Sequence, residues 1–156
     1  MLLKPRLGVV ICALLLTAAC GASAEGPPAI DVDRTACSHC GMLVSEPLYA
    51  AAYQVPGADA RVFDDIGCLL DALRLGADAP RSGQAGIRFW FHDAGDGAWI
   101  DGASAVFVSS AEIRTPMGGG FIAFRDAAAA QQAAVTHHGD VVRTLPELLT
   151  RKGGHR

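Results

Sequence analysis

Hydrophobic residues recur along the chain at two different spacings, which predict helices and strands. The clearest helical stretch is 64–75, where apolar residues follow the i, i+3, i+4, i+7 pattern of one helix face before Gly76 ends it. This apolar stripe consists of Ile66, Leu69, Leu70 and Leu73. Asp64 is placed to cap the helix, and Cys68 falls about opposite the stripe.

Short runs rich in aromatic and β-branched residues predict strands around this helix. The predicted strands are 48–55, 60–63, 87–92, 99–101, 105–109, 121–124 and 140–143. A Pro-Gly turn at 56–57 joins the first two strands, and an Asp- and Gly-rich turn at 93–97 makes a hairpin of the third and fourth. An alanine-rich helix is predicted over 126–135 with Asp126 as its cap, and a closing helical turn over 146–151.

The order of these elements repeats. The first copy is a strand that ends in Phe63-Asp64, then a helix, then a strand. The second copy has the same order after Phe124-Arg125-Asp126, and a methionine precedes each copy, Met42 the first and Met117 the second. We therefore expect an α+β fold of two small ββαβ-like units that share one core.

The first residues have the layout of a secretory signal rather than of a domain. Lys4 and Arg6 precede the uncharged run 7–19, which at about 1.5 Å per residue is too short to cross a hydrocarbon core of roughly 30 Å. Residues 1–19 are thus predicted to be a signal peptide and the chain to be exported. Its body, 30–156, is long enough to bury a core.

Two processing sites compete after the signal. The sequence 16–20 resembles a bacterial lipobox with Thr17 where leucine is more usual, and cleavage there would leave Cys20 as a lipid-modified N-terminus on a tether of residues 20–29. The alternative is Ala22-Ser23-Ala24, which fits ordinary signal peptidase and would release a soluble protein.

Composition and charge exclude several classes of protein. The chain has 51% hydrophobic residues, which is too many for a disordered protein. Its net charge of −3 lacks the surplus of basic residues that a nucleic-acid binder needs. The triple glycine at 118–120 lacks the Lys-Ser/Thr of a phosphate loop, so nucleotide binding is not expected. No serine lies in a Gly-x-Ser-x-Gly elbow, and we predict no catalysis.

The cysteines and methionines carry the candidate chemistry. The body contains Cys37, Cys40 and Cys68, an odd number, so at least one thiol is free or metal-bound. The segment 37–42 brings together two thiols, an imidazole and a thioether, and soft sulfur donors favour Cu(I). Gly41 allows a sharp turn within it. The second segment is 115–120, where a methionine stands beside three glycines and is expected to have little to pack against.

These features resemble the NosL family, the copper-binding lipoprotein accessory factors of nitrous oxide reductase. The resemblance is carried by the lipobox-like Cys20, by Cys-Gly-Met at 40–42, and by three later motifs. These are Trp-Ile-Asp at 99–101, Ala-Val-Phe-Val at 105–108, and Pro-Met-Gly at 116–118 leading into Ala-Phe at 123–124. It implies a pair of ββαβ units, similar in topology to part of organomercurial lyase. It also implies a periplasm-facing, membrane-tethered carrier that passes one Cu(I) to apo nitrous oxide reductase.

The resemblance also implies the ligands. The family's copper ligands match Cys40 and Met117, and Met42, Cys37 and His39 are the local choices for a third. Cys68 is expected to be a buried free thiol or a disulfide partner rather than a ligand. Lipid attachment maps onto Cys20.

Two other readings of the sulfur residues stay open. Cys37-Ser38-His39-Cys40 has the spacing of an exported thiol-disulfide oxidoreductase, although the sequence after it is poor for the helix that such a site opens. A zinc-stabilised binding module is the other alternative, and it would need a histidine beside the three cysteines.

Overall fold

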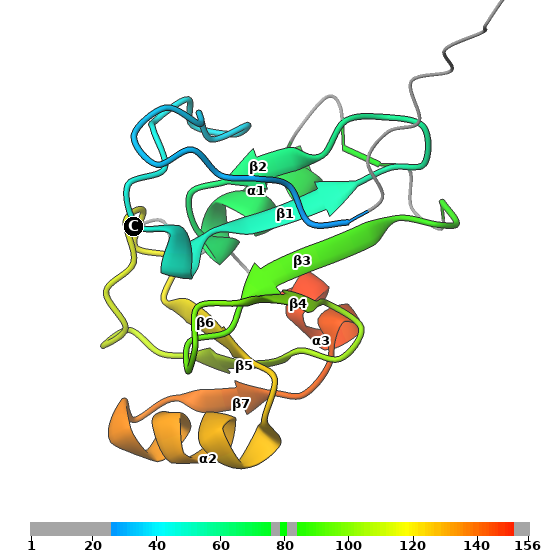
Figure 1. Ribbon diagram of the computed structural model, residues 1–156. Coiled ribbons are helices and arrows are strands. Elements are labelled where there is room, and N and C mark those ends of the chain that lie inside the picture. Colours follow the sequence, from blue (N-terminus) through cyan, green and yellow to red (C-terminus); the bar gives the residue numbers. More distant parts are fainter. Residues whose placement is uncertain (1–25, 76–78, 81–83, 152–156) are drawn as a thin grey trace, which may run out of the picture.

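The computed structural model describes residues 26–75, 79–80 and 84–151. Two antiparallel sheets form the upper and lower parts of the molecule in Figure 1. The predicted signal at 1–19 and the lipid site at Cys20 lie outside the described residues. Within the described part of the chain, no helix has the length and apolar character needed to span a membrane.

The two sheets are built from units of the same topology. The first unit comprises η1 (Pro47–Tyr49), β1 (Ala51–Gln54), β2 (Arg61–Phe63), α1 (Ile66–Leu75), β3 (Arg88–His92) and β4 (Trp99–Asp101). The second comprises β5 (Val106–Ser109), β6 (Phe121–Phe124), α2 (Ala127–Thr136), β7 (Asp140–Val142) and α3 (Leu145–Thr150). The strand orders are β2-β1-β3-β4 and β6-β5-β7, with the first strand of each unit paired antiparallel to its two neighbours. The predicted pair of ββαβ units is confirmed.

The structure departs from the predicted elements by more than one residue in two places. The strand expected over 48–55 begins only at Ala51, because Pro47 starts a short 3-10 turn instead. The cap of α1 is Asp65 and not Asp64. Asp65 Oδ1 accepts the N–H of Cys68 at 2.8 Å. Cys68 is the third residue of α1, and a capping side chain directly before a helix bonds the N–H of its second or third residue. The predicted cap of α2 is confirmed, since Asp126 accepts the N–H of Ala128.

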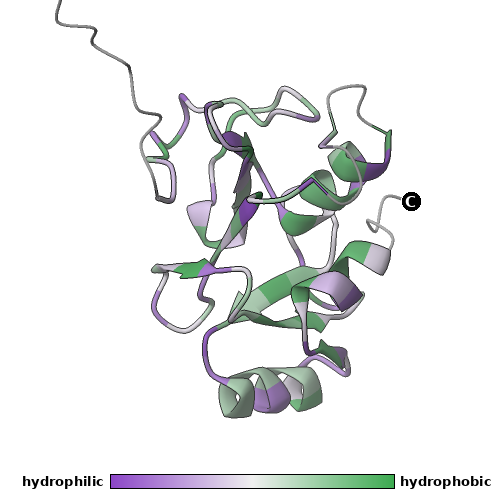
Figure 2. Ribbon diagram, turned by 90° about the vertical axis from the view of Figure 1, so that its right-hand side faces the viewer, coloured by the Kyte–Doolittle hydropathy of each residue, from purple (hydrophilic) through white to green (hydrophobic). Residues whose placement is uncertain are grey.

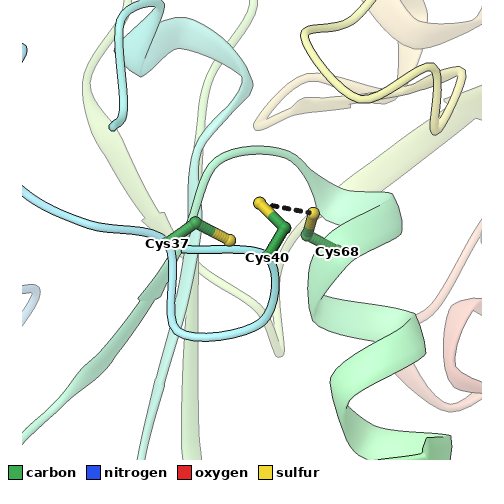
Figure 3. A group of neighbouring side chains, drawn as sticks. All are labelled: Cys37, Cys40 and Cys68. Carbon is green, nitrogen blue, oxygen red and sulfur yellow. Dashed lines mark hydrogen bonds between the residues drawn. The ribbon is translucent and has the colours of Figure 1, made fainter. Parts of the chain in front are cut away.

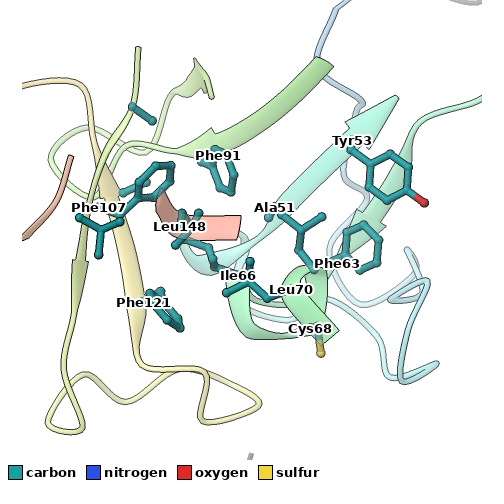
Figure 4. Close-up of a cluster of buried hydrophobic side chains, with 14 of the residues drawn as sticks. Ala51, Tyr53, Phe63, Ile66, Cys68, Leu70, Phe91, Phe107, Phe121 and Leu148 are labelled. Carbon is teal, nitrogen blue, oxygen red and sulfur yellow. The ribbon is translucent and has the colours of Figure 1, made fainter. Parts of the chain in front are cut away.

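One hydrophobic core joins the two units. Phe91 of β3 and Phe107 of β5 are fully buried, and their rings meet edge to face with centroids 4.8 Å apart (Figure 4). Side chains from α1, β6, β7 and α3 belong to the same buried cluster. Hydrophobic residues, green in Figure 2, recur along the strands of both sheets. Neither unit therefore completes its core without the other.

Because the core is shared, we expect Phe91→Ala to destabilise both units together. Emptying this site should lower the free energy of unfolding by about 3–5 kcal/mol. Chemical denaturation followed by circular dichroism and by tryptophan fluorescence should still give one coincident transition. Val135→Ala is the control, because Val135 is 70% exposed on α2 and its loss should change stability by less than about 0.5 kcal/mol. Separate transitions for the two probes would contradict a shared core.

Candidate metal centre

The first two cysteines of the body lie on a tight loop that is closed by backbone hydrogen bonds. The N–H of Cys37 donates to the carbonyl of Met42 at 2.8 Å. Gly41 has φ +76°, so the sharp turn expected there is confirmed. The N–H of Ser38 donates to the carbonyl of Val62 at 2.8 Å, which attaches the loop to β2. The positions of the two sulfurs are thus set by backbone contacts on both sides of the loop.

The third cysteine comes from the first turn of α1 and points at this loop. The Sγ atoms of Cys37, Cys40 and Cys68 all lie within 4.8 Å of one another, and those of Cys40 and Cys68 are 3.9 Å apart (Figure 3). All three thiols are free. Cys37 and Cys68 are buried, with 3% and 0% of their surface exposed, whereas Cys40 is exposed. Three sulfurs therefore converge, two of them buried and that of Cys40 on an exposed residue.

Hydrogen bonds and burial shift the pKa values of the three thiols in different directions. A hydrogen bond with the Cys68 thiol, together with backbone hydrogen bonds from Cys40, Asp64 and His39, lowers the pKa of Cys37 to about 4 despite burial. The same hydrogen bond, together with burial, raises the pKa of Cys68. Burial also raises the pKa of Cys40, with the charge of Cys37 adding to it. At neutral pH the cluster holds a negative charge on a buried sulfur.

A buried carboxyl group adds to the negative character of this site. Asp64 is only 2% exposed, and burial raises its pKa to about 6, with the charges of Cys37, Asp65 and Glu46 contributing in that order. The carboxyl and the thiolate therefore repel each other when both are charged. A cation bound to the sulfurs would relieve this repulsion, so the electrostatics favour a positively charged ligand.

The glycine-rich loop of Met117 is brought to the start of α1. The N–H of Met117 donates to Asp65 Oδ2 at 3.2 Å, while Oδ1 of the same carboxylate accepts the N–H of Cys68. Met117 is partly buried and packs against the core cluster that contains Cys68. The expectation that this methionine has little to pack against is therefore wrong. A distant segment of the chain is fixed beside the cysteine on α1.

The remaining sequence candidates are exposed residues of the loop that carries Cys37 and Cys40. Met42 is 56% exposed on the same loop as Cys40. His39 is exposed in the turn between the two cysteines and does not belong to the group of mutually close ligand atoms that the described residues form. Neither side chain is enclosed with the three sulfurs.

Cys68 is the residue that sequence reasoning undervalued. Cys68 is a buried free thiol, which was one of the two expected states, but it lies close to the other two thiols. Figure 4 shows its sulfur directed away from the aromatic rings of the core, in agreement with its place opposite the apolar stripe. The odd number of cysteines was the signal that a third thiol needed a role.

Comparisons with known proteins bear on the family and the fold of the chain. The family model described as NosL matches residues 29–146. A crystal structure of the copper chaperone NosL from Shewanella denitrificans superposes with a TM-score of 0.62 and 19% sequence identity, covering 79% of this chain and 98% of that chain. No curated protein matches the chain. Since the family model extends over most of the described residues, the chain belongs to the NosL family.

Proposed function

We propose that this protein is a carrier that binds one Cu(I) at the thiol cluster and passes it on. The observation that carries the proposal is the convergence of Cys37, Cys40 and Cys68, with all three Sγ atoms within 4.8 Å of one another. Soft thiolate and thioether ligands select Cu(I) among the common biological metals. The thioether of Met117 is the proposed additional ligand, delivered by the loop that Asp65 holds, and exposed Met42 is the alternative.

The family supports copper as the cargo. The solved relative named above is described as a copper chaperone. By the same resemblance, the acceptor is apo nitrous oxide reductase, and the protein faces the bacterial periplasm. Lipid attached at Cys20 would tether it to the membrane, and cleavage after Ala24 would instead leave it soluble in the periplasm.

The exposure of the ligands suits a carrier better than a storage site. Cys37 and Cys68 are buried, so water reaches the cluster at Cys40 and the neighbouring Met42. A ligand from a partner can approach copper on that side before the bonds to the buried sulfurs break. A closed four-ligand site of the structural zinc type leaves no such position. We infer that the protein moves copper and catalyses no reaction.

The geometry disfavours the two other readings. A thiol-disulfide oxidoreductase needs an accessible thiol with a lowered pKa, but here the lowered pKa belongs to buried Cys37 and the exposed thiol, Cys40, has a raised one. A structural zinc site needs four ligands, and the group formed by the described residues supplies three sulfurs without a histidine.

Anaerobic titration of the reduced protein with Cu(I) tests the proposed site. We expect one Cu(I) per chain, measured by competition with a chromophoric Cu(I) chelator. Cys40→Ser should weaken binding by more than about 100-fold, beyond the 10–100-fold typical of groups that only orient a ligand. Met117→Ala should weaken it less, because the thiolates remain. Ser38→Ala, in the same loop, is the control and should bind as the unaltered protein does. Equal affinity of Cys40→Ser and this control would contradict the site.

The reactivity of Cys40 separates the carrier from an oxidoreductase. Because its pKa is raised, alkylation of apo protein at Cys40 should still accelerate with pH above about 8.5, where an ordinary thiol is half ionised. Mass spectrometry after iodoacetamide treatment gives the rate at each cysteine. In Cys37→Ser the neighbouring charge is gone, so the rise of the Cys40 alkylation rate with pH should begin at lower pH. Rapid alkylation that no longer depends on pH near neutrality would instead indicate a redox active site.

Transfer to the proposed acceptor can be measured directly. The copper-loaded protein is incubated with apo nitrous oxide reductase, and the two proteins are then separated. We expect the reductase to gain as much copper as the carrier loses. An unrelated apo copper protein is the control acceptor. Copper that stays with the carrier while Cu(I) binding itself is intact would show that the acceptor is another protein.

A further inference from the structure

Asp65 is completely buried, and its two oxygens serve different parts of the chain. Oδ1 accepts the N–H of Cys68 at 2.8 Å, at the start of α1. Oδ2 accepts three donors from the glycine-rich loop: the Thr115 hydroxyl at 2.6 Å, the Met117 N–H at 3.2 Å and the Gly119 N–H at 3.1 Å. The backbone N–H groups of Cys68 and Met117 thus donate to opposite oxygens of one carboxylate, which links the helix to the loop.

Two glycines let the loop and the helix meet at this carboxylate. A Cβ added to Gly67 would lie 2.7 Å from the Cα of Gly119, and one added to Gly119 would lie 2.8 Å from the nitrogen of Gly67. These distances are too short for any side chain, so the two backbones are in direct contact. The loop is held by close packing as well as by hydrogen bonds.

The arrangement exceeds what helix capping requires. A cap needs one side-chain oxygen, and Asp126 at the start of α2 supplies one to the N–H of Ala128. In Asp65 the second oxygen is given entirely to the loop that carries Met117. The loop donors come from residues 50 to 54 positions later in the sequence, so the contact is tertiary and not part of the cap.

We propose that Asp65 is a positioning residue that couples the Met117 loop to the thiol cluster and so sets the contribution of the Met117 thioether to Cu(I) binding. This inference depends on the proposed function. Asparagine cannot replace the aspartate, because its amide group has one acceptor oxygen and one donor nitrogen. Whichever way the amide turns, either Cys68 or the three loop donors face another donor.

A double-mutant cycle tests the coupling. Cu(I) affinity is measured anaerobically, with the same chromophoric competitor, for the unaltered protein, Asp65→Asn, Met117→Ala and the double variant. We expect Asp65→Asn to weaken binding by about 10–100-fold, as is typical when groups that orient metal ligands are lost. In the Asp65→Asn background, Met117→Ala should have little further effect, since the thioether is already out of place. X-ray absorption should show one sulfur fewer on copper in Asp65→Asn.

Matched variants separate positioning from general loss of stability. Asp93→Asn is the control, because Asp93 is also buried and also accepts two backbone N–H groups, from Gly95 and Arg125, away from the cluster. It should bind copper normally. Thr115→Val should reproduce part of the Asp65→Asn defect, and Thr115→Ser, which keeps the hydroxyl, should restore binding. The Thr115 pair serves as the test if Asp65→Asn does not fold.

The outcomes distinguish this inference from the proposed function. Unchanged affinity in Asp65→Asn, additive effects of Asp65→Asn and Met117→Ala, or equal binding by Thr115→Val and Thr115→Ser would each overturn the positioning role. If Met117→Ala alone has no effect, the thioether is not a ligand and the inference is wrong, while the thiol site stands. If the unaltered protein binds no Cu(I), the proposed function itself is wrong.

Discussion

The buried carboxylate of Asp65 links the elements on which the rest of the site depends. It accepts one free N–H of the first turn of α1, that of Cys68, and it accepts three donors from the loop between β5 and β6. Hydrogen bonds to a charged acceptor are each worth about 1.5–3 kcal/mol when the acceptor is withdrawn from water. Without them a buried carboxylate would be strongly unfavourable, so the loop and the helix depend on each other.

This contact also explains why the two ββαβ units form one body. Asp65 belongs to the first unit, and its loop partners belong to the second. The same division runs through the core, where Phe91 of the first sheet meets Phe107 of the second. The hydrogen bonds of Asp65 and the aromatic contact in the core both hold the two units together. The thiol cluster lies on α1 of the first unit and on the loop 37–42 that is attached to β2, and the second unit contributes the loop of Met117.

The sequence predicted what depends on local pattern and missed what depends on tertiary contact. The strand at 121–124 and the cap at Asp126 follow from periodicity and capping chemistry, and the structure confirms both. The choice between Asp64 and Asp65 as cap could not be made, because adjacent aspartates differ only in where the chain turns. The role of Cys68 was hidden for a similar reason. Helical periodicity placed it away from the core stripe, but nothing local showed that the loop of residues 37–40 would cover that face.

The three sulfurs differ in exposure and in thiol pKa. A thiolate buried at Cys37 is stabilised by a thiol and by backbone N–H groups, so the charge that attracts a cation is present before any metal arrives. Because the pKa of Cys40 is raised, a metal that binds there would displace the proton of its thiol. In the proposed carrier, the exposed sulfur of Cys40 is the ligand that a partner's side chain can reach and replace first, while the buried sulfurs of Cys37 and Cys68 still hold the ion. The ion would then pass from one set of ligands to the next without free copper entering solution.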